Sequence, residues 1–170
     1  MATFNAFSRR NTLKFMLSVF GSGVCLGLAR RLAAMTAPGL VDFSGDVRVN
    51  GSAGGGAVQP GDRVTTGGDG NAVLMIGNDV YLLRPDSDVI FPAEGVVERV
   101  LTVVSGRLMG VFGRQSLRLE TPVATIGIRG TGAYMEVSAE RTYFCLCYGT
   151  AELRSRVDPG YVENLATFHH

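Results

Sequence analysis

After Pro38, glycine-rich turns divide the chain into short apolar runs, and this rhythm constrains the fold more than any other feature. Turn signals such as Asn50-Gly51, Pro60-Gly61-Asp62 and Gly67-Gly68-Asp69-Gly70 recur at intervals of about 8 to 12 residues. The runs between them are rich in valine, isoleucine and leucine, and none carries the apolar stripe of an amphipathic helix. We therefore expect an all-β domain of many short strands, built as a compact sandwich or as a short β-roll or β-helix.

The clearest local signal is a hairpin. The runs "AVLMIGN" and "DVYLLRP" flank Gly77-Asn78-Asp79, and such residues between two apolar runs favour a tight turn. Two pairs of acids, Asp69 with Asp79 and Asp86 with Asp88, lie in or near these turns. Neither pair has the register of a calcium-binding loop, so we interpret these acids as parts of solvated turns.

The N-terminus has the pattern of an export signal. Arg9 and Arg10 precede the uncharged stretch Phe15 to Ala29, which is shorter than the roughly 20 residues of a membrane span. The twin arginine resembles a Tat signal. We expect residues 1–37 to form a hydrophobic signal helix, either cleaved within Ala33–Ala37 or kept as a signal anchor. The mature protein would then be periplasmic, or anchored at the inner membrane.

Charge argues against nucleic-acid binding. The whole chain has 16 lysines and arginines against 15 acids, but five of the basic residues precede residue 38 and no acid does. The remainder has eleven arginines, no lysine and fifteen acids, hence a net charge of −4. A nucleic-acid-binding domain needs a clustered basic surface, and these arginines are scattered.

The motifs of common enzymes are also missing from the sequence. Its only histidines are His169 and His170 at the end of the chain, so a Ser-His-Asp triad would need a terminal residue. The segment "GGDGNA" lacks the lysine of a phosphate-binding loop. We therefore predict a non-enzyme without a cofactor.

Two cysteines lie one residue apart in "TYFCLCYG". On a strand, Cys145 and Cys147 share a face, with Cα atoms about 6.5–7 Å apart, which disfavours a disulfide. The leading interpretation is a pair of small apolar residues in the core. The alternative is a metal- or redox-linked protein in which Cys145, Cys147, His169 and His170 bind a transition metal such as Zn²⁺.

Five segments in order carry a resemblance to a known family. They are "GDVRVNG", "VQPGDRVTTGGDGNAVLMIG", "VVSGRLMGVF", "TPVATIGIRGTGAYMEV" and "RTYFCLCYGTAEL". Together they resemble the periplasmic FecR-type domain over about Val41 to Leu153. The resemblance implies a domain, here residues 38–170, like those that lie outside the inner membrane in regulators of iron-siderophore uptake. There the domain receives a signal from an outer-membrane transducer, while a cytoplasmic segment controls an extracytoplasmic-function sigma factor.

The sequence departs from the family's pattern before the apolar run. Only 14 residues precede Phe15, and they are too few and too basic to form the sigma-binding segment. We expect a stand-alone, exported FecR-like interaction module, linked to signalling of the iron-uptake type. Its partner would be an envelope protein or a small ligand, and it would contact the membrane only through an uncleaved N-terminal segment.

The segment "TPVATIGIRGTGAYMEV" holds the candidate binding or structural motif, Arg129, Gly130, Thr131 and Gly132. The preceding Ile126 and Ile128 would point into the core, and the glycines would permit a bend. The guanidinium of Arg129 could brace exposed carbonyls, pair with an acid such as Glu136, or clamp a carboxylate or another anion. We favour the brace, because five donors suit irregular backbone.

The export signal can be tested directly. Residues 1–40, fused to a reporter that is active only outside the inner membrane, should direct export through the Tat route. We expect reporter activity in a normal strain and retention of the fusion in a strain with a blocked Tat route. Export that persists in the blocked strain would contradict the twin-arginine interpretation.

Overall fold

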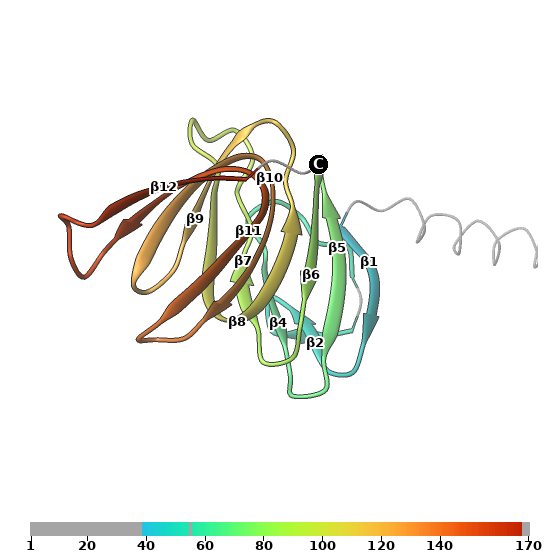
Figure 1. Cartoon of the computed structure of the whole chain (residues 1–170). Coiled ribbons are helices and arrows are strands. Elements are labelled where there is room, and N and C mark those ends of the chain that lie inside the picture. Colours follow the sequence, from blue (N-terminus) through green and yellow to red (C-terminus); the bar gives the residue numbers. More distant parts are fainter. Residues whose placement is uncertain (1–38, 55, 168–170) are drawn as a thin grey trace, which may run out of the picture. The chain divides into compact units, whose positions relative to one another are not determined.

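The computed structural model describes residues 39–54 and 56–167, and every helix or strand in these ranges is a β-strand (Figure 1). The expected signal helix, with Arg9 and Arg10, lies outside the described residues. Within the described ranges no helix has the length and apolar character needed to cross a membrane. The strands are β1 (Gly39–Ser44), β2 (Val47–Val49), β3 (Ser52–Ala53), β4 (Arg63–Thr66), β5 (Asn71–Ile76), β6 (Asp79–Leu83), β7 (Asp88–Ile90), β8 (Val100–Val111), β9 (Ser116–Glu120), β10 (Ala124–Val137), β11 (Thr142–Ser155) and β12 (Val162–Thr167).

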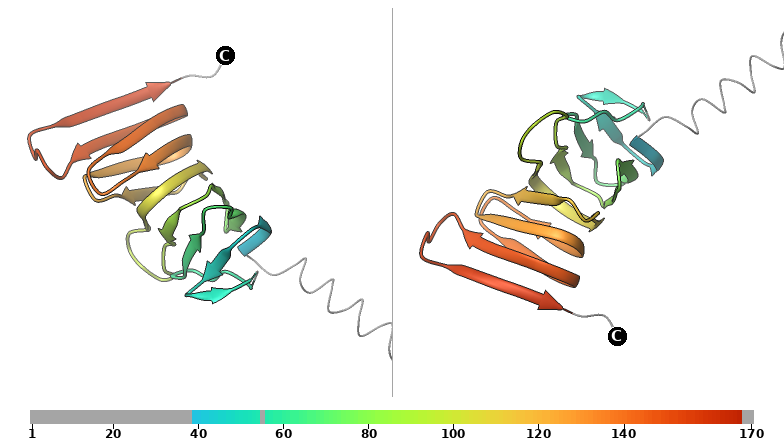
Figure 2. Two further views of the ribbon diagram at one scale, coloured as in Figure 1. Left: turned by 90° about the horizontal axis from the view of Figure 1, so that it is seen from below. Right: turned by 90° about the horizontal axis from the view of Figure 1, so that it is seen from above.

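All twelve strands belong to one sheet. Its main path runs β12-β11-β10-β9-β8-β7-β4-β2-β3, and β1, β5 and β6 form a branch that joins it at β8. Figure 2 shows β12, β11 and β10 following one another as neighbours, as this order requires. Only β8 and β9 pair in parallel; the other described strand pairs are antiparallel. The prediction of an all-β domain is confirmed. Its described strands are joined by hydrogen bonds into one continuous sheet.

Strand β8 changes partners along its length. Its first residues, from Val100 to Thr102, pair with β9, whereas Gly106 to Val111 pair with β10. The change occurs at Gly106, which has a φ of +99°. A Cβ atom there would lie 2.3 Å from the Cα atom of Ser87, so both the conformation and the space require glycine. This bend lets one strand serve two parts of the sheet.

Strands β10 and β11 are longer than expected. The run "ATIGIRG" and the "GAYMEV" of the next run form a single 14-residue strand, and "TYFCLCYG" with "TAELRS" forms another. At the join, Gly130 and Thr131 of β10 lie opposite Gly149 of β11, which is a β-bulge. Gly130 has a φ of +61° and Gly149 one of +96°. The glycines therefore bend continuous strands here, where the sequence pattern indicated turns between short ones.

The predicted turns at Asn50-Gly51 and at Gly77-Asn78 are confirmed. Asn50 and Gly51 join β2 to β3 with φ values of +51° and +83°. Two positive φ values are what a two-residue type I′ turn requires. Gly77 and Asn78 join β5 to β6, with Ile76 paired to Asp79.

The core lies between the folded parts of the sheet and follows the period of two. In β10 the predicted core residues Ile126 and Ile128 are buried, as are Met135 and Val137 further along. The ring of Tyr81 lies at the centre, where it meets Phe91 and Phe112 edge to face at centroid distances of 5.0 and 5.8 Å. Other fully buried large side chains include Leu74, Leu83, Leu101, Leu108, Leu119, Val47, Val58 and Val64.

The bend in β8 predicts a specific loss of stability. Gly106→Ala should lower the free energy of unfolding by about 3 kcal/mol, because it adds backbone strain and a clash with Ser87. Gly127→Ala is the matched control. A Cβ at Gly127 would have no atom within 4 Å, so its effect should stay within about 1 kcal/mol. Urea denaturation of both variants measures this, and equal effects would contradict the role of the bend.

Candidate functional site

The outer face of β9 to β12 presents polar side chains in rows that run across the strands. In the central row, Arg118 of β9 pairs with Gly127 of β10, and Gly127 pairs with Glu152 of β11. Asn164 of β12 continues this row. The neighbouring rows are Ser116-Arg129-Thr150-Ala166 and Glu120-Thr125-Arg154-Val162. These residues share a face because alternate residues of each strand point to the same side.

A groove with a volume of about 1520 Å³ lies over this face. The segment Val96–Arg99 forms part of its lining, together with the outer residues of the four strands. Gly127 contributes no side chain, so the middle of the central row is open. Polar side chains of the four strands thus line the groove together with apolar residues such as Leu117, Ile128 and Leu165, and the groove has room for a bound group.

Most charges in the groove are already paired. Arg118 contacts Glu98 at 2.5 Å, which ties the segment before β8 to β9, and Arg154 contacts Glu152 at 2.7 Å. Arg129 differs from these two, because within the described ranges its guanidinium contacts no carboxylate. Among the described residues, the groove thus offers one exposed cation whose charge is not neutralised by a neighbouring acid.

The structure places Arg129 beside the bulge. Its Nε donates a hydrogen bond of 3.1 Å to the backbone carbonyl of Arg114, in the loop before β9. Glu136, which the sequence offered as a partner, instead accepts a 2.8 Å hydrogen bond from the hydroxyl of Tyr134. Arg129 therefore contacts irregular backbone and also lines the groove.

Its neighbours in the motif are held by backbone contacts. Thr131 is fully buried, and its hydroxyl donates a hydrogen bond to the carbonyl of Thr150 across the bulge. Gly132 leaves room for the ring of Tyr148, since a Cβ there would lie 2.4 Å from that ring. Arg129, Gly130, Thr131 and Gly132 thus lie together at the bulge, and only Arg129 presents its side chain to the groove.

A second polar cluster, which the sequence did not predict, surrounds Asp79. Its carboxylate is buried and accepts hydrogen bonds from the Tyr81 hydroxyl at 3.1 Å and the Gly113 amide at 2.7 Å. It also forms an ion pair of 2.5 Å with Arg99. The interpretation of Asp79 as part of a solvated turn is therefore wrong. The carboxylate joins the β5–β6 hairpin to the residues before and after β8. Such a buried charge is stable only when it is paired.

The cysteines lie on the outward side of β11. Both are free thiols; Cys145 is half-buried and Cys147 is exposed. Their neighbours Phe144 and Leu146 pack against the core instead. The interpretation of the cysteines as core residues is thus wrong, because the opposite face of the strand turns inward. His169 and His170 lie outside the described residues, so the metal site stays a prediction.

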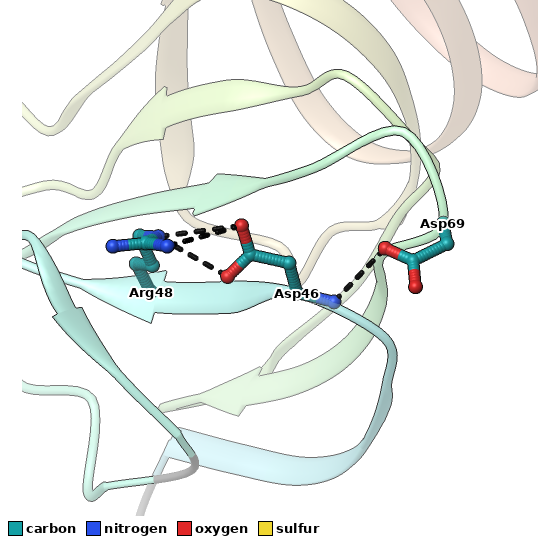
Figure 3. A network of polar contacts seen from close by, with 3 residues as sticks. All are labelled: Asp46, Arg48 and Asp69. Carbon is teal, nitrogen blue, oxygen red and sulfur yellow. Dashed lines mark hydrogen bonds and ion pairs between the residues drawn. The ribbon is translucent and has the colours of Figure 1, made fainter.

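The acids near the first turns bind backbone and arginine. Asp46 holds Arg48 through contacts of 3.1 to 3.3 Å, and the side chain of Asp69 accepts a hydrogen bond from the Asp46 amide (Figure 3). Asp88 likewise pairs with Arg63. In residues 39–54 and 56–167 no group of three or more His, Cys, Asp or Glu side chains is arranged to hold a metal ion.

Comparisons with known proteins give a match in fold. No family model and no curated protein matches the chain. Two crystal structures of a "putative anti-sigma factor" from Parabacteroides distasonis ATCC 8503, at 2.50 and 1.65 Å resolution, are similar to it. Each has a TM-score of 0.54 and 14% sequence identity, over 61% of this chain. The match spans 50% of the Parabacteroides chain, and at this identity the likeness is one of fold.

The cluster around Asp79 predicts how stability depends on pH. Burial and the neighbouring carboxylate raise the pKa of Tyr81 well above its ordinary value of about 10. Because the pKa of Tyr81 is raised in the folded state, the contribution of its protonated hydroxyl to the free energy of unfolding is complete below about pH 10 and declines above that pH. The free energy of unfolding should then fall by about 1.4 kcal/mol per pH unit from this residue.

Urea denaturation of the native protein and of Tyr81→Phe at increasing alkaline pH measures this decline. The variant should be less stable at neutral pH, by about 1 kcal/mol for the lost hydrogen bond, yet show a shallower alkaline decline. Tyr161→Phe is the control, because its exposed hydroxyl contacts only Glu163. A decline as steep in Tyr81→Phe as in the native protein would contradict the assignment.

Proposed function

We propose that this protein is an exported, non-catalytic binding module of the FecR type, which takes part in signalling at the cell envelope. The observation that carries the proposal is the match in fold to a protein described as an anti-sigma factor. The ordered segments from "GDVRVNG" to "RTYFCLCYGTAEL" support the same family. The link to iron uptake rests on that resemblance.

The described residues offer a binding surface of the kind such a module needs. The groove over β9 to β12 has paired charges along its floor and the unpaired cation of Arg129 at one side. A carboxylate, either of a small ligand or of an envelope protein, would complement that cation. The same residues include no histidine, the side chain that most often acts as general acid or base in enzymes.

The regulatory role can be tested by deleting the gene in its own organism and comparing transcripts under iron limitation and iron excess. We expect a set of transcripts for envelope or uptake proteins to change, and the native gene to restore them. Arg129→Ala should restore them only in part, because it removes the free cation of the groove. Arg141→Ala, in the exposed turn between β10 and β11, is the matched control and should restore them fully.

Two results would contradict the proposal. A deletion that leaves all transcripts unchanged under both conditions would exclude a role in signalling. Retention of the protein in the cytoplasm would exclude a role in the envelope. Full restoration by Arg129→Ala would leave the signalling role in place and remove the groove from it.

A further inference from the structure

The sheet has a second outward surface, made by β5, β6, β8, β10 and β11, and it is apolar. The pairing of residues across neighbouring strands arranges its side chains in rows. In one row Met75 of β5 pairs with Val80 of β6, and Val80 pairs with Val111 of β8. In the next row Val73 pairs with Leu82, and Leu82 pairs with Met109. We call this surface the outer apolar face; its residues are Val73, Met75, Val80, Leu82, Met109, Val111, Tyr134, Tyr143, Cys145 and Tyr148.

The rows continue from β8 onto β10 and β11. Met109 pairs with Tyr134 of β10, and Tyr134 pairs with Cys145 of β11. Val111 pairs with Gly132, over which the ring of Tyr148 lies. The rings of Tyr134 and Tyr143 add an edge-to-face contact with centroids 6.5 Å apart. The face therefore extends across five neighbouring strands.

Several of these side chains are open to solvent. Met75 is 50% exposed, Met109 and Val111 are each 45% exposed, and Val80 is 36% exposed. The opposite side of the same strands carries the core residues Leu74, Tyr81, Leu83, Leu108 and Met135. An antiparallel sheet with one buried face normally presents polar residues on the other. A contiguous exposed apolar surface is uncommon on a soluble monomer and often marks a site of interaction.

Charge identifies the kind of partner. Arg84 and Arg107 lie side by side at the border of the outer apolar face, where the amide of Arg84 donates a hydrogen bond to the carbonyl of Arg107, and Arg107 is opposite Glu136 of β10. Within the described ranges neither guanidinium forms an ion pair. Beside the two arginines, Glu136 already accepts the hydrogen bond from Tyr134, and the other acid of this border, Asp42, lies across the face on β1, opposite Val73. A partner would therefore need an apolar surface with carboxylates at the matching border.

We propose that the outer apolar face docks a protein partner whose apolar surface is bordered by aspartate or glutamate. Tyrosine and methionine are enriched at the centres of protein interfaces, and both are present here. A membrane surface fits less well. Anionic lipid recruits clusters of about four to eight basic residues, whereas this border has two arginines on a body of net charge −4. The inference deepens the proposed function, since it assigns a protein-binding surface apart from the groove.

Photo-cross-linking of the full chain in its own cells tests this. The photoreactive residue p-benzoylphenylalanine would replace Val80 or Met109 on the outer apolar face. Val157, an exposed valine in the turn between β11 and β12, would be replaced as the matched control. We expect one protein adduct from positions 80 and 109 and none from 157. Mass spectrometry of the adduct should map the attachment to an apolar segment flanked by Asp or Glu.

Charge reversal then decides whether the contact is the one proposed. Arg84→Glu with Arg107→Glu should lower the adduct yield by about tenfold or more, because like charges would face each other. Replacing the mapped acids of the partner by lysine should restore the yield with the doubly reversed variant. Positions 80, 84, 107 and 109 are all exposed, and circular dichroism with thermal unfolding would verify that each variant folds.

The alternative outcomes overturn the inference. An adduct to lipid, an adduct to a second copy of this chain, no adduct at 80 and 109, or a yield unaffected by charge reversal would each do so. These results are separable from failure of the proposed function. Transcripts that respond to the deletion without an adduct would refute this surface alone, whereas a charge-dependent adduct without a transcript response would refute the signalling role alone.

Discussion

The pairing of β8 with four other strands is the interaction on which the rest of the structure depends. One half of this strand lies beside β7 and β9, and the other half lies beside β6 and β10. The bend at Gly106 makes this division possible, since only a glycine fits against Ser87 with that φ. Through β8, the branch of β1, β5 and β6 and the path toward β12 become a single sheet around one core. The groove and the outer apolar face are two of the outward surfaces that result.

The sequence predicted those features that local chemistry decides. The turn at Asn50-Gly51 and the hairpin at Gly77-Asn78 follow from residues that accept positive φ next to alternating apolar residues. The continuity of β10 through Gly130 could not be predicted in this way. A glycine between two apolar runs fits a turn or a bulge equally well, and the choice depends on a partner strand that is distant in sequence. For the same reason the pattern alone did not separate a sandwich from a roll.

The candidate site likewise combines features that the local sequence predicts with features that depend on distant strands. Alternation correctly placed Ile126 and Ile128 in the core, and it left Arg129 on the outer side. The row that joins Arg118 to Glu152 through Gly127 depends on the register of three strands, which no single segment encodes. For Cys145 and Cys147, alternation predicted that both side chains share one face of the strand, but it did not predict whether that face points to the core or to solvent. The run "NAVLMI" did hold a signal for the outer apolar face, because an uninterrupted apolar strand is typical of a strand covered on both sides.

The position of β12 at the end of the sheet has a consequence for the order in which the molecule opens. Among the described strands it pairs with β11 alone, and Leu165 is its only side chain packed against the core. Local stability therefore decreases from β8 outward, and β12 can separate while the central strands keep their hydrogen bonds. The groove borders this less stable edge, whereas the outer apolar face includes the central strand itself. The groove is thus formed partly by a strand that can separate first. The outer apolar face contains strands that stay paired until the whole domain unfolds.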